Sequence, residues 1–144
     1  KLYRNALSHA DCVGLAIATR PDCISEEVLA LLDSLNRETF LWIELGLQTI
    51  HDTTAAYIRR GYPLSVFEDT MDRLAQAGIE VIVHTILGLP GETSEMVLET
   101  INYLNQKPIA GIKLQLLHVL KNTDLATEYE NKVFSVEVIM KPIM

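Results

Sequence analysis

Two periodicities of apolar residues alternate along the chain and predict its secondary structure. Residues 12–18, 41–47, 79–87 and 111–117 form short, mostly apolar runs, which are typical of β-strands. Around these runs, leucine, isoleucine and valine recur at a spacing of three or four residues, which predicts helices with one apolar face. The expected helices cover residues 2–9, 26–35, 52–60, 66–77, 94–104 and 124–130. Strands that alternate with helices favour a parallel sheet.

Several polar residues and glycines mark where these helices should begin and end. Ser25 stands before two glutamates, as a helix N-cap followed by acids in the first turn would. Ser65 and Glu68 have the S-x-x-E spacing of a capping box. Gly78 fits a C-terminal stop. These signals place a helix after Ser25 and another between Ser65 and Gly78.

The predicted strands have one polar and one apolar face, which limits how the sheet can be covered. Glu44, Gly46 and Gln48 alternate with isoleucine and leucine, and Lys113 and Gln115 do the same later in the chain. A doubly wound sheet would need apolar residues on both faces, because helices cover both. We therefore expect an α/β fold whose parallel strands form a curved partial barrel, with helices outside and a ligand cavity along the inner wall. Four strands are too few to close a barrel of eight.

Composition adds limits on location and partners. The 144 residues suit one domain, and 49% of them are apolar, which is enough for a core. A net charge of −7 disfavours nucleic-acid binding by this segment alone, because phosphates require a basic face. Two cysteines are too few for a disulfide framework, and no apolar run approaches the ~20 residues of a membrane span. We expect a cytoplasmic protein that contacts no membrane.

The domain organisation expected from the sequence is a single unit followed by a short tail. Residues 1–134 carry the alternating pattern, whereas residues 135–144 have no clear period and are left unplaced. The sequence starts at Lys1 rather than at a methionine, so we expect it to be part of a longer protein.

Polar residues near the strand ends are the candidate functional residues. The carboxyl ends of parallel strands meet at one edge, where such folds place their sites. The side chains expected near this rim are Arg20, Asp22, Glu44, Gln48, His84 and His118. Residues 88–91 (GLPG) follow a strand directly and lack the G-K-[ST] ending of a P-loop. Their glycines suit either a tight turn or the close approach of a flat ligand.

Some of the same residues are also candidate metal ligands. Glu44, His84 and His118 resemble a two-histidine, one-carboxylate set, although no two of them have the i, i+4 spacing of a helical pair. Ten residues separate Cys12 from Cys23, so the chain lacks a CxxxCxxC or CxxC motif.

Four motifs in order resemble those of radical S-adenosylmethionine (SAM) enzymes. They are residues 18–22 (ATRPD), 44–49 (ELGLQT), 59–62 (RRGY) and 87–92 (LGLPGE). The order and spacing are most similar to the bacterial YtqA/YhcC-like family, which is related to the Elongator catalytic subunit. The continuation in residues 111–123 is similar to that family too. The resemblance covers residues 2–134.

The resemblance implies a fold and a cofactor chemistry. The family has a partial (β/α)6 TIM-like barrel, of which this chain would supply about four βα units from the C-terminal part. A 4Fe–4S cluster and SAM generate a 5′-deoxyadenosyl radical, after an electron arrives from a donor such as flavodoxin or ferredoxin. The cluster ligands are expected outside this chain. Kinship with Elongator-type enzymes implies an oxidoreductase-like radical enzyme that modifies RNA, with tRNA as the expected partner.

The resemblance also assigns individual side chains to SAM. Gln48 matches a glutamine that binds the ribose, because an amide can both donate and accept. Arg60 matches an arginine that pairs with the SAM carboxylate, with Arg59 as the alternative match. Ile86 and Leu87 match the apolar contact with adenine.

Two further residues are assigned less specifically. His84 stands where some relatives have an acidic ribose contact. Glu44 faces inward and would bind SAM or substrate, or pair with a nearby cation.

The chain departs from the family pattern at two positions. Ala18 replaces an acid that contacts SAM in several relatives, and Tyr62 replaces the histidine of the common RGH pattern.

Two other functions remain open on sequence alone. One is a barrel enzyme that holds a divalent metal on Glu44, His84 and His118. The other is a half-barrel that binds a ligand without catalysis. The open inner wall of four strands would need a cover, either further strands or a second copy of the chain in a homo-oligomer.

Overall fold

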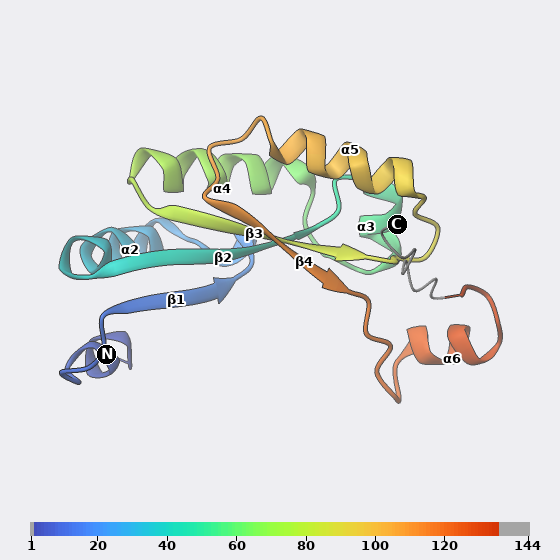
Figure 1. Cartoon of the computed structure of the whole chain (residues 1–144), viewed down its shortest axis with the longest axis horizontal. Helices are drawn as coiled ribbons and strands as arrows, with labels where there is room; N and C mark the ends of the chain where they lie inside the picture. Colours follow the sequence, from blue (N-terminus) through green and yellow to red (C-terminus); the bar gives the residue numbers. More distant parts are fainter. Residues whose placement is uncertain (1, 136–144) are drawn as a thin grey trace, which may run out of the picture.

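The computed structural model describes residues 2–135, and its centre is a sheet of four parallel strands (Figure 1). The strands lie in the order β1-β2-β3-β4. Their bounds are Gly14–Thr19 (β1), Phe40–Gln48 (β2), Glu80–Leu87 (β3) and Gly111–Leu116 (β4). Each lies within two residues of its predicted range, so the expected parallel α/β sheet is confirmed.

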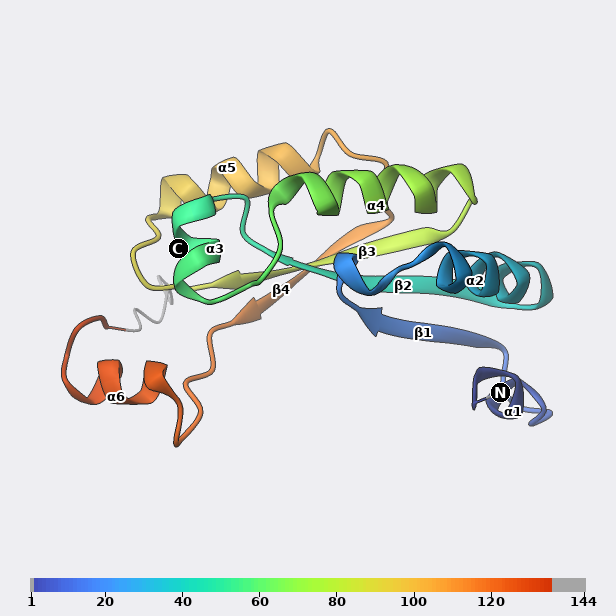
Figure 2. The same ribbon diagram turned by 180° about the vertical axis from the view of Figure 1, so that it is seen from behind.

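Helices connect successive strands, and one further helix precedes β1 and another follows β4. They are α1 (Leu2–Leu7), α2 (Glu26–Glu38), α3 (Asp52–Tyr57), α4 (Leu64–Gln76), α5 (Ser94–Leu104) and α6 (Asp124–Glu130), with a 3-10 turn, η1, at Pro21–Cys23. Figures 1 and 2 show α4 and α5 lying along one face of the sheet, while α6 stands apart beyond the end of β4. No described helix lies along the opposite face of the sheet.

Alternation along the strands explains why only one face is covered. Ile43, Leu45 and Leu47 point toward the helices and are fully buried, whereas Glu44 and Gln48 on the other face are half-buried. The core between sheet and helices also includes Leu35, Phe67, Met71, Leu74, Val81 and Val83. The predicted division into an apolar outer face and a polar inner face is therefore confirmed.

The edge strand β4 departs from this pattern. Leu114 and Leu116 are each 56% exposed, although their alternation with Lys113 and Gln115 predicted a buried apolar face. The next helix, α6, has no buried residue of its own. Ile112 near the start of β4 packs against the core, so the uncovered part of this outer face is the end that carries Leu114 and Leu116.

Local signals were right at two helix ends and wrong at a third. Ser25 accepts a hydrogen bond from the backbone of Val28, and Gly78 follows α4 with a φ of +65°. The capping box predicted for Ser65 and Glu68 does not form. The helix begins two residues earlier, at Leu64, with Pro63 at its N-cap. Glu68 instead accepts hydrogen bonds from Tyr103 and Lys107, which lie on or just after α5.

The helix predicted for residues 52–60 is shorter than expected. It ends at Tyr57, because Arg59 and Gly61 both adopt positive φ angles, of 54° and 87°. Arg60 therefore lies in the connection between α3 and α4 and not on a helix surface. Among residues 2–135, no helix is both long and apolar enough to cross a bilayer.

Candidate functional site

The strand ends, the α3–α4 connection and α6 line an open cavity of about 460 Å³. Gln48 from β2, Ile86 from β3 and Arg60 from the connection all line it. Thr123, Asp124, Leu125 and Glu128 form the wall contributed by α6 and the residue before it. A volume of this size lies within the usual range for small-molecule sites. The structure therefore brings together six of the residues singled out in the sequence, because Arg20, Arg59 and Tyr62 line the same cavity.

Gln48 lines the cavity in an unusual backbone conformation. Its φ is +68°, which side chains other than glycine rarely adopt. The register of β2 against β3 shifts between Gly46 and Gln48, so a bulge ends the strand. A Cβ atom on Gly46 would lie 2.7 Å from the Gln48 Nε2 atom. The glycine therefore leaves room for the amide to lie across the strand.

Arg60 is a buried cation that lacks one hydrogen-bond partner. Only 5% of its surface is exposed. Its Nη1 atom donates to the carbonyl oxygens of Leu47 and Thr49, at 3.3 and 2.7 Å, and its Nε atom donates to that of Tyr62 at 3.0 Å. Its Nη2 atom is buried with no partner among the described residues. A buried N–H group without a partner is costly, so this atom is suited to a ligand acceptor.

The neighbouring Arg59 has a different environment. Its side chain is 79% exposed and pairs with Asp124 at the start of α6, at 2.6 Å. Of the two arginines considered from the sequence, Arg60 is the one with a buried guanidinium and an unsatisfied donor.

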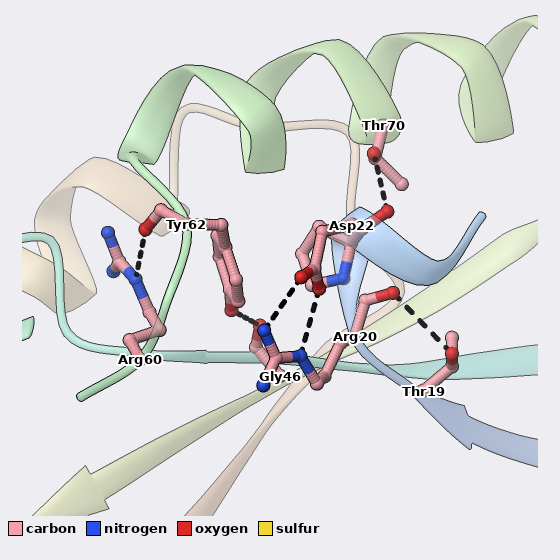
Figure 3. A network of polar contacts seen from close by, with 8 residues as sticks. Thr19, Arg20, Asp22, Gly46, Arg60, Tyr62 and Thr70 are labelled. Carbon is pink, nitrogen blue, oxygen red and sulfur yellow. Dashed lines mark hydrogen bonds and ion pairs between the residues drawn. The ribbon is translucent and has the colours of Figure 1, made fainter. Parts of the chain in front are cut away.

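The ring of Tyr62 lies between two guanidinium groups (Figure 3). The Arg60 carbon Cζ is 4.8 Å from the ring centroid and that of Arg20 is 5.4 Å away. The Tyr62 hydroxyl donates to the carbonyl oxygen of Gly46. Burial raises the pKa of this phenol, so it stays protonated and able to donate.

Arg20 is held in place by Asp22, which follows it in η1. The Arg20 Nε and Nη2 atoms donate to the two carboxylate oxygens at 2.9 and 2.7 Å. These hydrogen bonds lower the pKa of Asp22 below its ordinary value. The pair follows β1, so the ends of β1 and β2 and the α3–α4 connection form one polar network.

Glu44 and His84 lie on the inner face in a separate ionic cluster. The Glu44 Oε2 atom accepts a hydrogen bond from Lys113 Nζ at 3.0 Å and lies 3.0 Å from His84 Nε2. The His84 ring is not oriented for a hydrogen bond at that distance. Neither Glu44 nor His84 lines the cavity, and Leu87 points away from it because successive strand residues face opposite sides.

We expect the Lys113→Met substitution to raise the pKa of Glu44 toward its ordinary value. The hydrogen bond from Lys113 is the main cause that lowers this pKa. A lowered pKa stabilises the fold above the pKa of the unfolded chain, and this contribution is lost as the pH falls through the folded value. Carboxyl ¹³C NMR titration would measure the shift. The matched Lys107→Met substitution should raise the pKa of Glu68 and leave that of Glu44 unchanged; the reverse result would contradict the assignment.

The alternative metal set is not brought together. Glu44 and His84 are close, but His118 is exposed beyond the end of β4. Within residues 2–135, no three histidine, cysteine, aspartate or glutamate side chains lie where they could share a metal ion.

The sequence pattern missed two other contributors to the site, namely the hydrogen bond of the Tyr62 hydroxyl and the cavity wall formed by α6. The substitution of tyrosine into an RGH-like motif was the available signal for the first.

Comparison with known proteins identifies relatives along most of the chain. A sequence model of the Radical SAM superfamily matches residues 3–104. The protein YtqA of Bacillus subtilis is 41% identical over 128 residues, which are 89% of this chain and 40% of YtqA. A tRNA uridine(34) acetyltransferase of Dehalococcoides mccartyi is 30% identical over 125 residues, covering 84% of this chain and 26% of that enzyme.

A solved structure supports the same relationship. The archaeal Elp3 of Methanocaldococcus infernus matches with a TM-score of 0.75 and 26% identity, over 86% of this chain and 29% of Elp3. The chain thus spans about two fifths of the length of YtqA and less of the two other proteins named here.

Proposed function

This chain belongs to the radical SAM superfamily, and on that basis we propose that its strand-end cavity holds SAM in an enzyme that cleaves it reductively. The observation that carries the proposal is that Arg60 lines a cavity shared with Gln48 and Ile86 and has a buried Nη2 atom without a partner among the described residues. Buried donors without partners are uncommon, and a bound ligand would satisfy this one.

Arg60 would bind the carboxylate of SAM. Its other donors are taken by backbone carbonyl oxygens, which fix the plane of the guanidinium. The remaining nitrogen can therefore form a charge-assisted hydrogen bond without further ordering of the side chain. The stacking of the group on Tyr62 adds to this rigidity.

Gln48 and the end of β3 would bind the nucleoside part. The Gln48 amide can donate to one ribose hydroxyl and accept from the other. Ile86 offers an apolar surface to adenine, and Gly88, with a φ of +83°, turns the chain directly after β3. A glycine at this point lets a flat ring approach the backbone closely. The adenine contact assigned to Leu87 and the SAM contacts assigned to Glu44 and His84 remain predictions.

The cluster would be bound outside the described residues. Cys12 precedes β1 and Cys23 ends η1, and the described residues include no group of ligands that could hold a metal. When bound beside SAM, a reduced 4Fe–4S cluster supplies the electron that splits SAM into methionine and a 5′-deoxyadenosyl radical, which takes a hydrogen atom from substrate. This chain would orient SAM and exclude water from one side of it. The electron would come from a flavodoxin or ferredoxin.

RNA is the substrate class that we propose, with tRNA as the specific partner. The support comes from the relatives named for action on tRNA uridine 34. The acidic composition of the chain argues that other parts of such an enzyme would bind the phosphates.

The proposed activity can be tested on the complete product of the gene. After anaerobic reconstitution with iron and sulfide, addition of dithionite and SAM should yield 5′-deoxyadenosine and methionine in equal amounts. Unmodified tRNA should increase the rate more than an equal mass of ribosomal RNA. A protein with a full cluster that binds SAM but releases no 5′-deoxyadenosine would favour a binding module without catalysis.

A further inference from the structure

Three backbone carbonyl oxygens around Gln48 accept hydrogen bonds from two residues of the α3–α4 connection. The carbonyl oxygen of Gly46 accepts the hydroxyl of Tyr62, and those of Leu47 and Thr49 accept Nη1 of Arg60. Side chains of this connection therefore bind three carbonyl groups that flank Gln48, two before it in the chain and one directly after it. This is the segment in which Gln48 adopts its positive φ angle.

We propose that Tyr62 is a positioning residue that couples the two SAM contacts, Gln48 and Arg60, so that neither is correctly placed without it. The inference rests on the proposed function, because it concerns the same cavity. It adds a role for a side chain that binds no ligand atom in this scheme. Tyr62 is 8% exposed and completes the polar network at the strand ends.

Tyr62 acts on Gln48 through the strand. A left-handed conformation is unfavourable for a residue with a Cβ atom, so it persists only where surrounding contacts impose it. The hydrogen bond from the Tyr62 hydroxyl to Gly46 is one of those contacts, and it lies at the bulge that turns Gln48 toward the cavity. Without this bond, the end of β2 can relax and the amide can leave its position over Gly46.

Tyr62 acts on Arg60 directly. Its carbonyl oxygen accepts the Arg60 Nε–H, and the face of its ring lies 4.8 Å from the guanidinium carbon. The ring is in turn supported on its other side by Arg20, which Asp22 holds through two hydrogen bonds. Figure 3 shows this arrangement, with the Tyr62 ring between Arg60 and the Arg20–Asp22 pair. One side chain thus contacts both elements that carry the proposed cofactor contacts.

The Tyr62→Phe substitution separates the hydroxyl from the ring. It removes the hydrogen bond to Gly46 and keeps the stacking between the two arginines. In the 144-residue chain, we expect SAM affinity, measured by calorimetry, to fall about fivefold, the scale of one net hydrogen bond. The same substitution in a Gln48→Gly background should change affinity less than about twofold, because the amide to be positioned is already absent.

If Tyr62 contributed only to the stability of the fold, the loss of SAM affinity in Tyr62→Phe would not depend on whether Gln48 is present. The Tyr103→Phe substitution is the matched control. It removes a phenolic hydroxyl bonded to Glu68, away from the cavity, and should leave SAM affinity unchanged in both backgrounds. Equal losses for Tyr62→Phe with and without Gln48, or no loss in either, would overturn the proposal.

A second measurement needs no SAM. The NMR shifts of the Gly46 carbonyl carbon and of the Gln48 Cα atom report on the hydrogen bond and on the left-handed backbone. Both should change in Tyr62→Phe and neither should change in Tyr103→Phe. Unchanged shifts in Tyr62→Phe would overturn the positioning role, and this test does not depend on SAM binding. If the chain bound no SAM, that result would by itself contradict only the proposed function.

Discussion

Replacing Arg60 with alanine should destabilise the fold by about 3 kcal/mol and weaken SAM binding by about 100-fold or more. The stability loss arises because the carbonyl oxygens of Leu47, Thr49 and Tyr62 lose their donors in a buried site. The affinity loss arises because the substitution removes the proposed carboxylate contact and frees the backbone that positions Gln48. Chemical denaturation and calorimetry would measure the two effects.

The adjacent Arg59 provides the matched control. Its guanidinium is exposed and pairs only with the exposed carboxylate of Asp124, so alanine at this position should cost less than about 1 kcal/mol. The affinity of the Arg59→Ala variant for SAM should stay within about threefold of that of the unsubstituted chain. A larger loss of affinity for Arg59→Ala than for Arg60→Ala would transfer the carboxylate contact to Arg59.

Replacing Gln48 with glycine should weaken SAM binding about tenfold without any loss of stability. Glycine adopts a φ of +68° at little steric cost, so the free energy of unfolding should stay the same or rise by up to about 1 kcal/mol. The amide that would bind the ribose is lost, which costs a polar contact. A site that retains glutamine where glycine would be more stable indicates that the side chain serves the ligand.

Two other substitutions test this explanation from different directions. Gln48→Ala removes the same amide but keeps the backbone strain, so it should match the affinity loss without any gain in stability. Gly46→Ala should displace the Gln48 amide, because the new Cβ atom would lie 2.7 Å from Nε2. Its affinity should fall as in Gln48→Ala, and combining the two should add nothing. Full additivity would show that Gly46 acts on SAM by another route.

Much of the fold could be predicted because the strands carry their signal in alternation. Each even position from Glu44 to Gln48 is half-buried on the inner face and each odd position is buried. The inner location of Glu44 and its pairing with a cation, Lys113, follow from the same alternation. The sequence pattern failed where a distant partner decided the outcome, as it did for Glu68, which bonds Tyr103 and Lys107 instead of a helix end.

The candidate site was predicted less completely for a related reason. The roles proposed for Gln48 and Arg60 came from a family resemblance, and the burial of Arg60 could not be anticipated. Its partners are backbone carbonyl oxygens at a bulge, and no pattern of side chains reveals them. The exposure of Leu114 and Leu116 likewise depends on where α6 lies, which their alternation does not specify.

The central claim is that SAM binds the strand-end cavity through Gln48, Arg60 and Ile86. Titration of SAM into the ¹⁵N-labelled chain, followed by two-dimensional NMR, tests it most directly. We predict saturable shifts at these three residues, including the Gln48 side-chain amide, with little change at the single indole N–H of Trp42 on the inner face. No saturable shift at millimolar SAM, or shifts centred on Trp42 and His84, would contradict the claim.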